Sequence, residues 1–276
     1  QERLEHQLET DVSLKVTPTD QPDSWVVAGR GELHLSILIE NMRRDGFDLQ
    51  DSKPQLILRE IDGVLSEPFE RVQCEVPSEN AGAVIDSLGA RKGEMLDMMT
   101  TDNGLTRLIF MVPARGMIGY TTEFMSMTRG YGIINNTFEE FSPSFKAQIG
   151  GSRNGSLISM DQGQATSYAI INLEDRGVNF MEPGTEVYEG MIVGEHNREN
   201  DLTVNITKAK HQTNVRSATK DQTQTMNRPR ILTLEEALQF INDDELVEVT
   251  PQSIRLRKKI LNKSAISNFY HCHIPF

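Results

Sequence analysis

The chain has 276 residues, of which 37% are hydrophobic and 25% are charged, and its formal net charge is -12. This length allows two or three domains of about 100 residues each, and the hydrophobic content excludes a chain that is disordered throughout. The longest apolar run, Leu108 to Ala114, has seven residues, whereas a membrane-spanning helix needs about 20, so we expect no membrane partner.

The ends of the chain and its cysteines indicate a fragment of an intracellular protein. Cys74 and Cys272 lack the paired spacing of a metal site or a disulfide framework, so a cytoplasmic location is expected. The chain begins at Gln1 without a cationic and apolar leader, and we expect it to be the C-terminal piece of a longer protein. The acidic net charge does not exclude a nucleic-acid partner, because binding depends on where the charges lie.

One motif of the first region, 1–63, recurs in the second. VAGRGELHLSILIENMRRDGF (27–47) and VPARGMIGYTTEFMSMTRGYG (112–132) match at six positions at a constant offset of 85, including Arg30 with Arg115 and Gly31 with Gly116. In the first copy the apolar positions 35, 38, 39 and 42 have the spacing of one helix face. The repeat predicts a duplicated unit in which an Arg-Gly step joins a strand to a helix.

The repeat also argues against a nucleotide site at Gly29-Arg30-Gly31. The second copy has Ala114 in place of the first glycine, which makes that glycine dispensable to the unit. A phosphate cradle would need more backbone N–H groups and a Lys or Ser/Thr ligand. Contacts of Arg30 and Arg115 with RNA phosphates or with a neighbouring domain remain open.

The second region, 64–146, gives the complete order of elements. Strands are expected at 69–76, 95–100, 105–112 and 133–141, and helices at 78–88 and from about 119, with Asp102-Asn103-Gly104 as a hairpin turn. This β-α-β-β-α-β order predicts a ferredoxin-like (split β-α-β) domain. Mapped onto 1–63, the plan places the end of a helix at 1–9, strands at 12–16 and 24–28 and a last strand from 47. The first domain is therefore predicted to be truncated at its N-terminus.

The third region, 147–276, has a different texture. Strand-rich segments are expected at 157–160, 165–172 and 185–195, with Pro183-Gly184 as a turn, and a short helix at 232–245 with Thr233 as its N-cap. We therefore predict an α+β chain with two ferredoxin-like domains, 1–63 and 64–146, followed by a β-rich C-terminal domain, 147–276, that carries a short helix.

The third region also contains a basic loop at 208–230. The range 205–232 has six basic residues against one acidic residue, and almost nothing between 210 and 230 is apolar. The segment is either a solvated loop with incidental charge or a loop that becomes ordered on phosphates. In the second interpretation its RNA-binding residues are Lys208, Lys210, His211, Thr213, Asn214, Arg216, Lys220, Arg228 and Arg230. A second basic block, 254–263, includes Arg255, Arg257 and Lys258, which are candidates for secondary RNA or domain contacts.

These motifs resemble a known family over residues 1–261. GRGELHLSILIENMRRDGF resembles the third domain of translational GTPases of the elongation factor G type, and VPARGMIGYTTEFMSMTRGYG resembles their fifth domain. GQATSYAIINLEDRG, PGTEVYEGMIVGEHNRENDLTVN and LTLEEALQFINDDELVEV are similar to the TypA/BipA family. This resemblance implies a cytoplasmic, ribosome-binding protein in which a GTPase domain and a β-barrel domain come first, and which acts in large-subunit assembly and stress adaptation.

The resemblance also implies the partners and the chemistry. The loop would contact large-subunit rRNA and the acceptor end of the A-site tRNA through Lys210, Thr213, Asn214 and Arg216, and at His211 the family often has a second basic residue. GTP and magnesium belong to the full-length protein. The chain has no G-x-x-x-x-G-K-[ST] loop and no N-K-x-D motif, so we assign it neither a cofactor nor hydrolysis.

Two alternatives come from other classes. An enzyme would have to use His34, His196, Glu195 or the pair Asp243-Asp244, but no nucleophile, base and orienting group are visible together, and His271-Cys272-His273 is too compact for a metal site. A regulatory protein-interaction module with no direct RNA contact is the second alternative, since repeated ferredoxin-like folds also bind peptides.

Overall fold

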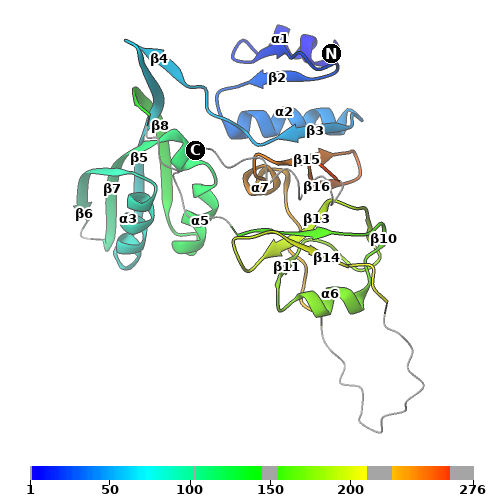
Figure 1. The fold of residues 1–276 in the computed structure, drawn as a ribbon. Helices are drawn as coiled ribbons and strands as arrows, with labels where there is room; N and C mark the ends of the chain where they lie inside the picture. The colour runs from blue at the N-terminus through cyan, green and yellow to red at the C-terminus, as the bar shows by residue number, and fades with distance from the viewer. Residues whose placement is uncertain (1, 102, 145–153, 210–225, 262–276) are drawn as a thin grey trace. The chain divides into compact units, whose positions relative to one another are not determined.

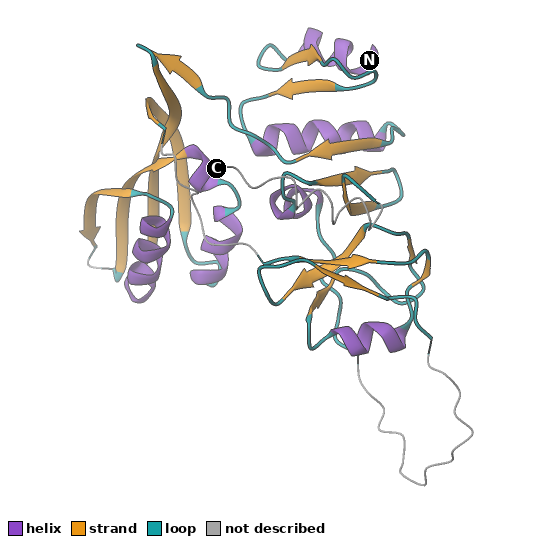
Figure 2. Cartoon of the chain, viewed as in Figure 1, coloured by secondary structure: helices purple, strands orange, loops and turns teal. Residues whose placement is uncertain are grey.

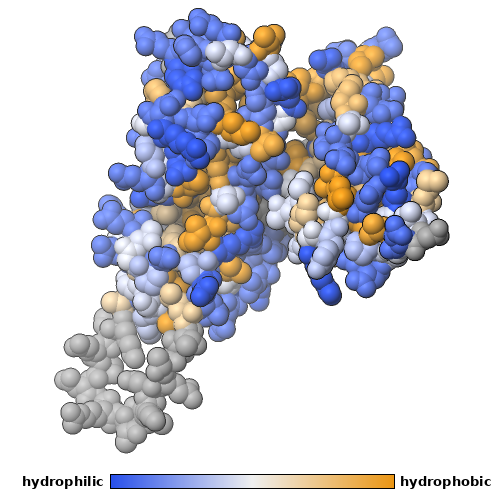
Figure 3. All heavy atoms as spheres, turned by 180° about the vertical axis from the view of Figure 1, so that it is seen from behind, coloured by the Kyte–Doolittle hydropathy of each residue, from blue (hydrophilic) through white to orange (hydrophobic). Residues whose placement is uncertain are grey.

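A computed structural model of the chain describes residues 2–101, 103–144, 154–209 and 226–261. It separates into two compact units (Figure 1). Unit 1 combines Gln1–Lys53 with Arg153–Phe276, and unit 2 is Pro54–Ser152. Helices and strands occur in both units (Figure 2), so the predicted α+β class is confirmed. Hydrophobic residues form separate patches on the largely hydrophilic face in Figure 3.

Unit 2 contains one antiparallel sheet. Its strands are β4 (Arg59–Ile61), β5 (Val64–Pro77), β6 (Glu94–Thr100), β7 (Leu105–Pro113) and β8 (Ile133–Pro143). The four long strands lie in the order β8-β5-β7-β6, and β4 forms a hairpin with the start of β5. The helices are η1 (Ser78–Asn80), α3 (Ala81–Ala90), α4 (Ala114–Met117) and α5 (Tyr120–Met127). The elements predicted between 69 and 141 are thus present in the predicted order.

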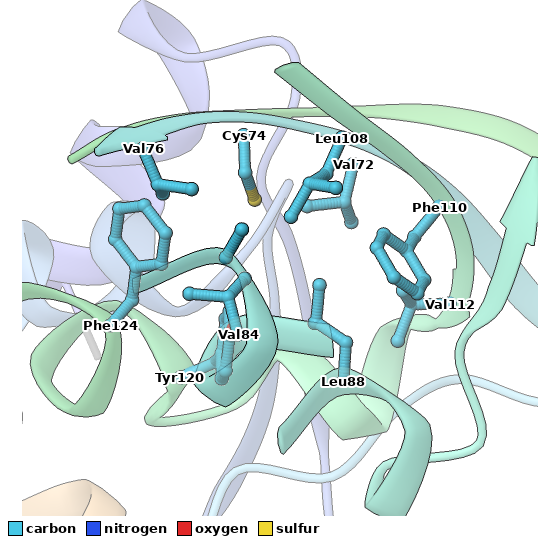
Figure 4. Close-up of a cluster of buried hydrophobic side chains, with 11 residues drawn as sticks. Val72, Cys74, Val76, Val84, Leu88, Leu108, Phe110, Val112, Tyr120 and Phe124 are labelled. Atoms are coloured by element: carbon cyan, nitrogen blue, oxygen red, sulfur yellow. The ribbon is translucent and has the colours of Figure 1, made fainter. Parts of the chain in front are cut away.

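The core of unit 2 follows from the alternation of its strands. Val72, Cys74 and Val76 of β5 are fully buried, whereas the residues between them lie outside the core. Figure 4 shows these side chains and those of β7 pointing toward Leu88 of α3 and Phe124 of α5. A period of two in the strands and about 3.6 in the helices therefore brings the apolar faces together.

The first part of unit 1 has five elements. They are α1 (Glu2–Thr10), β1 (Lys15–Pro18), β2 (Trp25–Ala28), α2 (Glu32–Arg44) and β3 (Leu49–Ser52). Strands β1 and β2 pair with each other, and their apolar side chains pack against a buried cluster that includes Leu38 and Met42 of α2. The first strand begins at Lys15 rather than at the predicted residue 12. Asp11 explains the difference, because its side chain and carbonyl accept the N–H groups of Ser13 and Leu14 and form a turn.

The second part of unit 1 is rich in short strands, as predicted. They are β9 (Ser156–Ser159), β10 (Gly163–Gln164), β11 (Gly177–Asn179), β12 (Glu186–Val187), β13 (Met191–His196), β14 (Leu202–Val204), β15 (Glu245–Val249) and β16 (Ile254–Lys258). Helix α7 (Leu234–Phe240) begins at a capping box of Thr233 and Glu236, so the predicted N-cap is confirmed.

The prediction of a strand at 165–172 is wrong. These residues form helix α6 (Ser167–Leu173), and the hydroxyl of Thr166 accepts the N–H of Ala169 as its N-cap. Ala169, Ile170 and Leu173 are buried. Their spacing is that of one helix face, which a strand with a period of two would not bury together.

The two parts of unit 1 share a sheet. Its strands follow the order β14-β9-β13-β16-β15-β3, and β11 also pairs with β13. Strand β3 thereby connects the first part to the second, with Leu49 opposite Val249 and Ser52 opposite Leu246. Ile39 of α2 and Leu49 also pack against the apolar cluster around α7. The division into three domains with boundaries at 63 and 146 stays a prediction.

Candidate nucleic-acid interface

The segment that precedes residue 210 is held at the start of α6. The hydroxyl of Thr166 donates a hydrogen bond to the carbonyl of Lys208 over 2.6 Å. The backbone N–H of Thr166 donates to the carbonyl of Ile206 over 3.0 Å. Because Thr166 also caps α6, one residue begins the helix and fixes the segment 206–208 that follows strand β14 (Leu202–Val204).

The segment that follows residue 225 is held at the other end of the same helix. The carboxylate of Glu174, the C-cap residue of α6, accepts the backbone N–H of Asn227 over 2.8 Å and its side-chain amide over 2.9 Å. The backbone N–H of Arg230 then donates to the carbonyl of Asn179 over 2.8 Å. A seven-residue helix is about 10 Å long, so the two sides of the loop leave the fold a short distance apart.

The described basic residues on the two sides of the loop differ in their surroundings. Lys208 and Arg228 are exposed, and neither side chain forms an ion pair with another described residue. Arg230 lies 3.5 Å from Glu195 and 3.6 Å from Glu236. The pKa of Glu236 is lowered chiefly by the backbone N–H of Thr233 and further by Arg230. The remaining predicted RNA-binding residues lie outside the described residues: Lys210, His211, Thr213, Asn214, Arg216 and Lys220.

Comparison with known proteins shows to which family the chain belongs. A model described as the elongation factor G C-terminus matches residues 64–149, and a model described as the TypA/BipA C-terminal domain matches residues 154–263. The chain belongs to the TypA/BipA family. It therefore carries, in sequence order, the two C-terminal modules that the sequence motifs predicted.

Several curated TypA/BipA proteins are similar to the chain over nearly its whole length. The large ribosomal subunit assembly factor BipA of Bacillus subtilis is 66% identical over 264 residues, which are 96% of this chain and 43% of that protein. The proteins of the same name from Synechocystis and Escherichia coli are 49% and 47% identical, covering 93% and 95% of this chain. The chain thus spans 43% of the length of these relatives.

Two of the predicted secondary contacts in this TypA/BipA chain are used within the fold. Nε of Arg115 lies 2.7 Å from Oε2 of Glu67, whose side chain is fully buried, and a second guanidinium nitrogen donates to Oε1 over 3.1 Å. Arg257 lies 3.2 Å from Glu248 and donates to the side chain of Gln50. Arg255 is half-buried, whereas Arg30 is exposed. Of these four, Arg30 is the one best placed to meet a partner.

Lys258 is excluded as an RNA contact by its burial. Its side chain is 3% exposed, and Nζ lies 2.6 Å from Asp201, 2.8 Å from Asp244 and 2.9 Å from Glu245. Burial disfavours the charged form, but these carboxylates outweigh it and raise the pKa of Lys258. The ion pairs of this lysine therefore have a structural role, because they connect the end of β16 to the residues that precede β14 and β15.

The histidines considered for catalysis also have structural partners. Nδ1 of His34 accepts the N–H of Arg30 over 3.2 Å, and Nε2 lies 2.5 Å from Asp11. Nδ1 of His196 donates to the carbonyl of Asn200. Among the described residues, no cluster of three His, Cys, Asp or Glu side chains is suited to a metal ion, and no helix is long and apolar enough to cross a membrane.

The basic loop stays a prediction, since most of it lies outside the described residues, but sequence reasoning missed the residues that hold its two described sides. Thr166, Glu174 and Asn227 were overlooked because α6 was interpreted as a strand. The signal was present in the sequence: Thr166 precedes apolar residues at 169, 170 and 173, a spacing that favours a capped helix.

Proposed function

We propose that this chain is the ribosome-binding part of a large-subunit assembly factor, and that its loop 208–230 binds large-subunit rRNA and the acceptor region of the A-site tRNA. The observation that carries this proposal is the fixation of both sides of the loop at the two ends of α6. A basic segment whose ends are held close together gives up less entropy when it becomes ordered on phosphates. The relatives' name, large ribosomal subunit assembly factor, supports the same partner.

The charge of the loop suits an RNA backbone. Lys208, Lys210, Arg216, Lys220 and Arg228 supply cations for phosphates, Thr213 and Asn214 supply hydrogen-bonding groups, and His211 adds a cation only when it is protonated. Because the chain has a net charge of -12, this local basic segment would also orient the protein toward RNA while the rest of its surface is repelled.

We further propose that unit 2 is a ferredoxin-like domain. Its strand order, β8-β5-β7-β6, is the order that a β-α-β-β-α-β chain adopts in that fold when the strands are numbered 4-1-3-2. The α-β-β-α-β order of 2–52 suits the same plan without its first strand. A solved structure in which unit 2 had another strand order, or in which β1 and β2 of residues 2–52 did not pair, would refute this assignment.

The activity of the whole protein is a separate part of the proposal. We infer that a GTPase domain, which binds GTP and magnesium, and a β-barrel domain belong to the full-length protein, and that the protein acts in ribosome assembly and stress adaptation. Full-length protein should hydrolyse GTP in the presence of ribosomes, and this chain alone should not. Turnover of GTP by the purified chain would refute the assignment of hydrolysis to the GTPase domain.

The decisive experiment measures binding to large ribosomal subunits as a function of salt. We expect Lys210→Ala and Arg216→Ala each to weaken binding and to lower the slope of log K against log[salt] by about 0.7 to 0.9 for each phosphate that the variant no longer neutralises. Lys15→Ala and Lys259→Ala remove exposed cations outside the loop and serve as controls. Unchanged slopes for the loop variants would refute the RNA contact.

Chemical footprinting separates this proposal from a protein-interaction module. The full-length protein with a GTP analogue should protect large-subunit rRNA and the tRNA acceptor end, and Lys210→Ala with Arg216→Ala should remove that protection. Binding that persists without any RNA protection would favour the regulatory, protein-binding alternative.

A further inference from the structure

We propose that the outer edge of β6 in unit 2 binds an extended, basic polypeptide segment that adds to the sheet as a further strand. Within the described residues β6 pairs with β7 alone, so no further strand covers its other edge; on that edge the N–H of Met98 donates to the carboxylate of Asp97 over 2.9 Å, and an added strand would have to displace that contact. This is the geometry that proteins use for strand addition. The site lies in unit 2, whereas the basic loop belongs to unit 1, and the proposal does not depend on RNA binding by that loop.

The side chains of β6 are unusual for a strand in a sheet with a packed face. All seven residues are exposed, although Met98 lies opposite the fully buried Leu108. Met99 is 60% exposed, and the other large apolar residues of the strand, Met95, Leu96 and Met98, are 47%, 48% and 47% exposed. Apolar surface is therefore available on both faces of the strand, where a docking segment would place alternate side chains.

Methionine suits such a surface because it is flexible and polarisable. Three of the four large apolar residues of β6 are methionines. Unbranched thioether side chains can repack around different partners, as they do at other adaptable binding surfaces. The strand is thus better suited to a family of similar segments than to one rigid shape.

The charges of β6 select a basic occupant. Glu94 and Asp97 are the charged residues of the strand, and no basic residue lies within 94–104. The nearby Arg107 is already paired with Glu75 over 2.6 Å. The exposed Lys92 precedes Glu94 by two residues, which leaves residues 92–100 with a net charge of -1. A second copy of the chain would bring the same acidic edge and a net charge of -12, and it would be repelled. An RNA strand would be repelled for the same reason.

The register of β6 limits the length of the added strand. The pairing with β7 shifts between Met95 and Asp97, which leaves Leu96 outside the ladder. The regular part from Asp97 to Thr100 is short, so the main-chain hydrogen bonds would be few. The apolar and ionic side-chain contacts must then supply most of the affinity and the selectivity.

The test uses the chain with two fluorescent eight-residue peptides, one alternating valine and lysine and one alternating valine and glutamate. We expect the valine-lysine peptide to bind and to protect the amides of 94–100 from hydrogen exchange, and the valine-glutamate peptide to bind about tenfold more weakly or not at all. Met99→Lys and Glu94→Lys should each weaken binding of the basic peptide by roughly threefold to tenfold.

Two matched variants control for charge and for general loss of methionine. Glu60→Lys makes the same charge change on β4, and Met125→Lys replaces a methionine that is 40% exposed on α5; both should bind like the unchanged chain. Circular dichroism and thermal unfolding confirm that all variants fold. Equal binding of both peptides, no added protection of 94–100, or self-association through β6 that Met99→Lys abolishes would each overturn the proposal.

Discussion

Thr166 and Glu174 lie at the two ends of α6, and each holds one side of the loop 208–230 through hydrogen bonds to its chain. Neither residue carries positive charge. They nevertheless determine how far the two sides of the loop can separate, and hence how much freedom the loop loses when it meets a large partner.

This arrangement predicts that Thr166→Val with Glu174→Ala weakens RNA binding without changing its salt dependence. The variant keeps every basic residue but frees the two sides of the loop, so ordering the loop costs more, and we expect a loss of roughly threefold to tenfold in affinity. Thr203→Val with Glu182→Ala makes the same two kinds of change at exposed side chains that hold neither side of the loop, and it should have no effect. Binding to large subunits over a salt series tests this, and an unchanged affinity or an altered slope would contradict it.

Lys258 should stabilise the fold and leave RNA binding alone. Lys258→Met would leave Glu245, whose side chain is fully buried, and two further carboxylates without their shared cation, which costs about 3–5 kcal/mol for a buried pair. Lys259→Met changes an exposed neighbour and should cost less than about 0.5 kcal/mol. Urea unfolding measures both, and an effect of Lys258→Met as small as that of its neighbour would refute the buried ion cluster.

The carboxylates around Lys258 also determine how the stability of the fold should change at alkaline pH. The pKa of Lys258 is raised in the folded chain, so its contribution is fully present below the ordinary lysine value of about 10.4 and is lost as the pH rises through the folded value. The chain should therefore lose stability above about pH 10.5 more steeply than the Lys258→Met variant.

A second pH effect on stability is expected from Asp51 of β3, which lies opposite Val247 of β15. Burial raises the pKa of Asp51 to about 6, and its Oδ2 makes no hydrogen bond with another described group. The folded state thus holds a proton that the unfolded state has released, and the free energy of unfolding should fall as the pH rises from about 4 to about 6. Asp51→Asn should remove this fall and raise stability at pH 7 by about 2–3 kcal/mol. A pH series of urea unfolding with both proteins checks it, and parallel curves would contradict it.

The successful predictions rested on local periodicity. The buried Val72, Cys74 and Val76 of β5 alternate, and the buried Leu38 and Met42 of α2 are four residues apart, so these faces could be inferred from neighbouring residues alone. Helix α6 was missed because a seven-residue helix with two adjacent isoleucines has little room to show a period and its composition favours a strand.

The contacts that hold unit 1 together could not be inferred in that way. Strand β3 pairs with β15 across almost 200 residues of sequence, and the carboxylates around Lys258 come from two separate places in the chain, Asp201 and the neighbouring pair Asp244 and Glu245. No local pattern records such pairings, because each depends on how distant strands are ordered in the sheet. Lys258 accordingly resembled a surface cation until its burial was seen.

The repeated Arg-Gly motif provides a direct test of why its two copies differ. A Cβ at Gly29 would lie 2.7 Å from Nδ1 of His34, whose ring is held by the N–H of Arg30 and by Asp11. In the second copy the first glycine is Ala114 and the histidine position is Gly119, so that copy has no imidazole at the corresponding place. Gly29 is therefore dispensable to the repeated unit but required beside His34.

A double-mutant cycle measures this dependence. Gly29→Ala should destabilise the chain by about 1–3 kcal/mol, because the fixed imidazole cannot move aside. In a His34→Ala background the same change should cost little, giving a coupling energy of about 1–2 kcal/mol. Gly31→Ala is the matched control, since a Cβ there meets nothing within 4 Å, and it should cost less than about 1 kcal/mol. Urea unfolding of the four proteins decides the matter: if Gly29→Ala costs the same with and without the histidine, the ring is not the reason for the glycine.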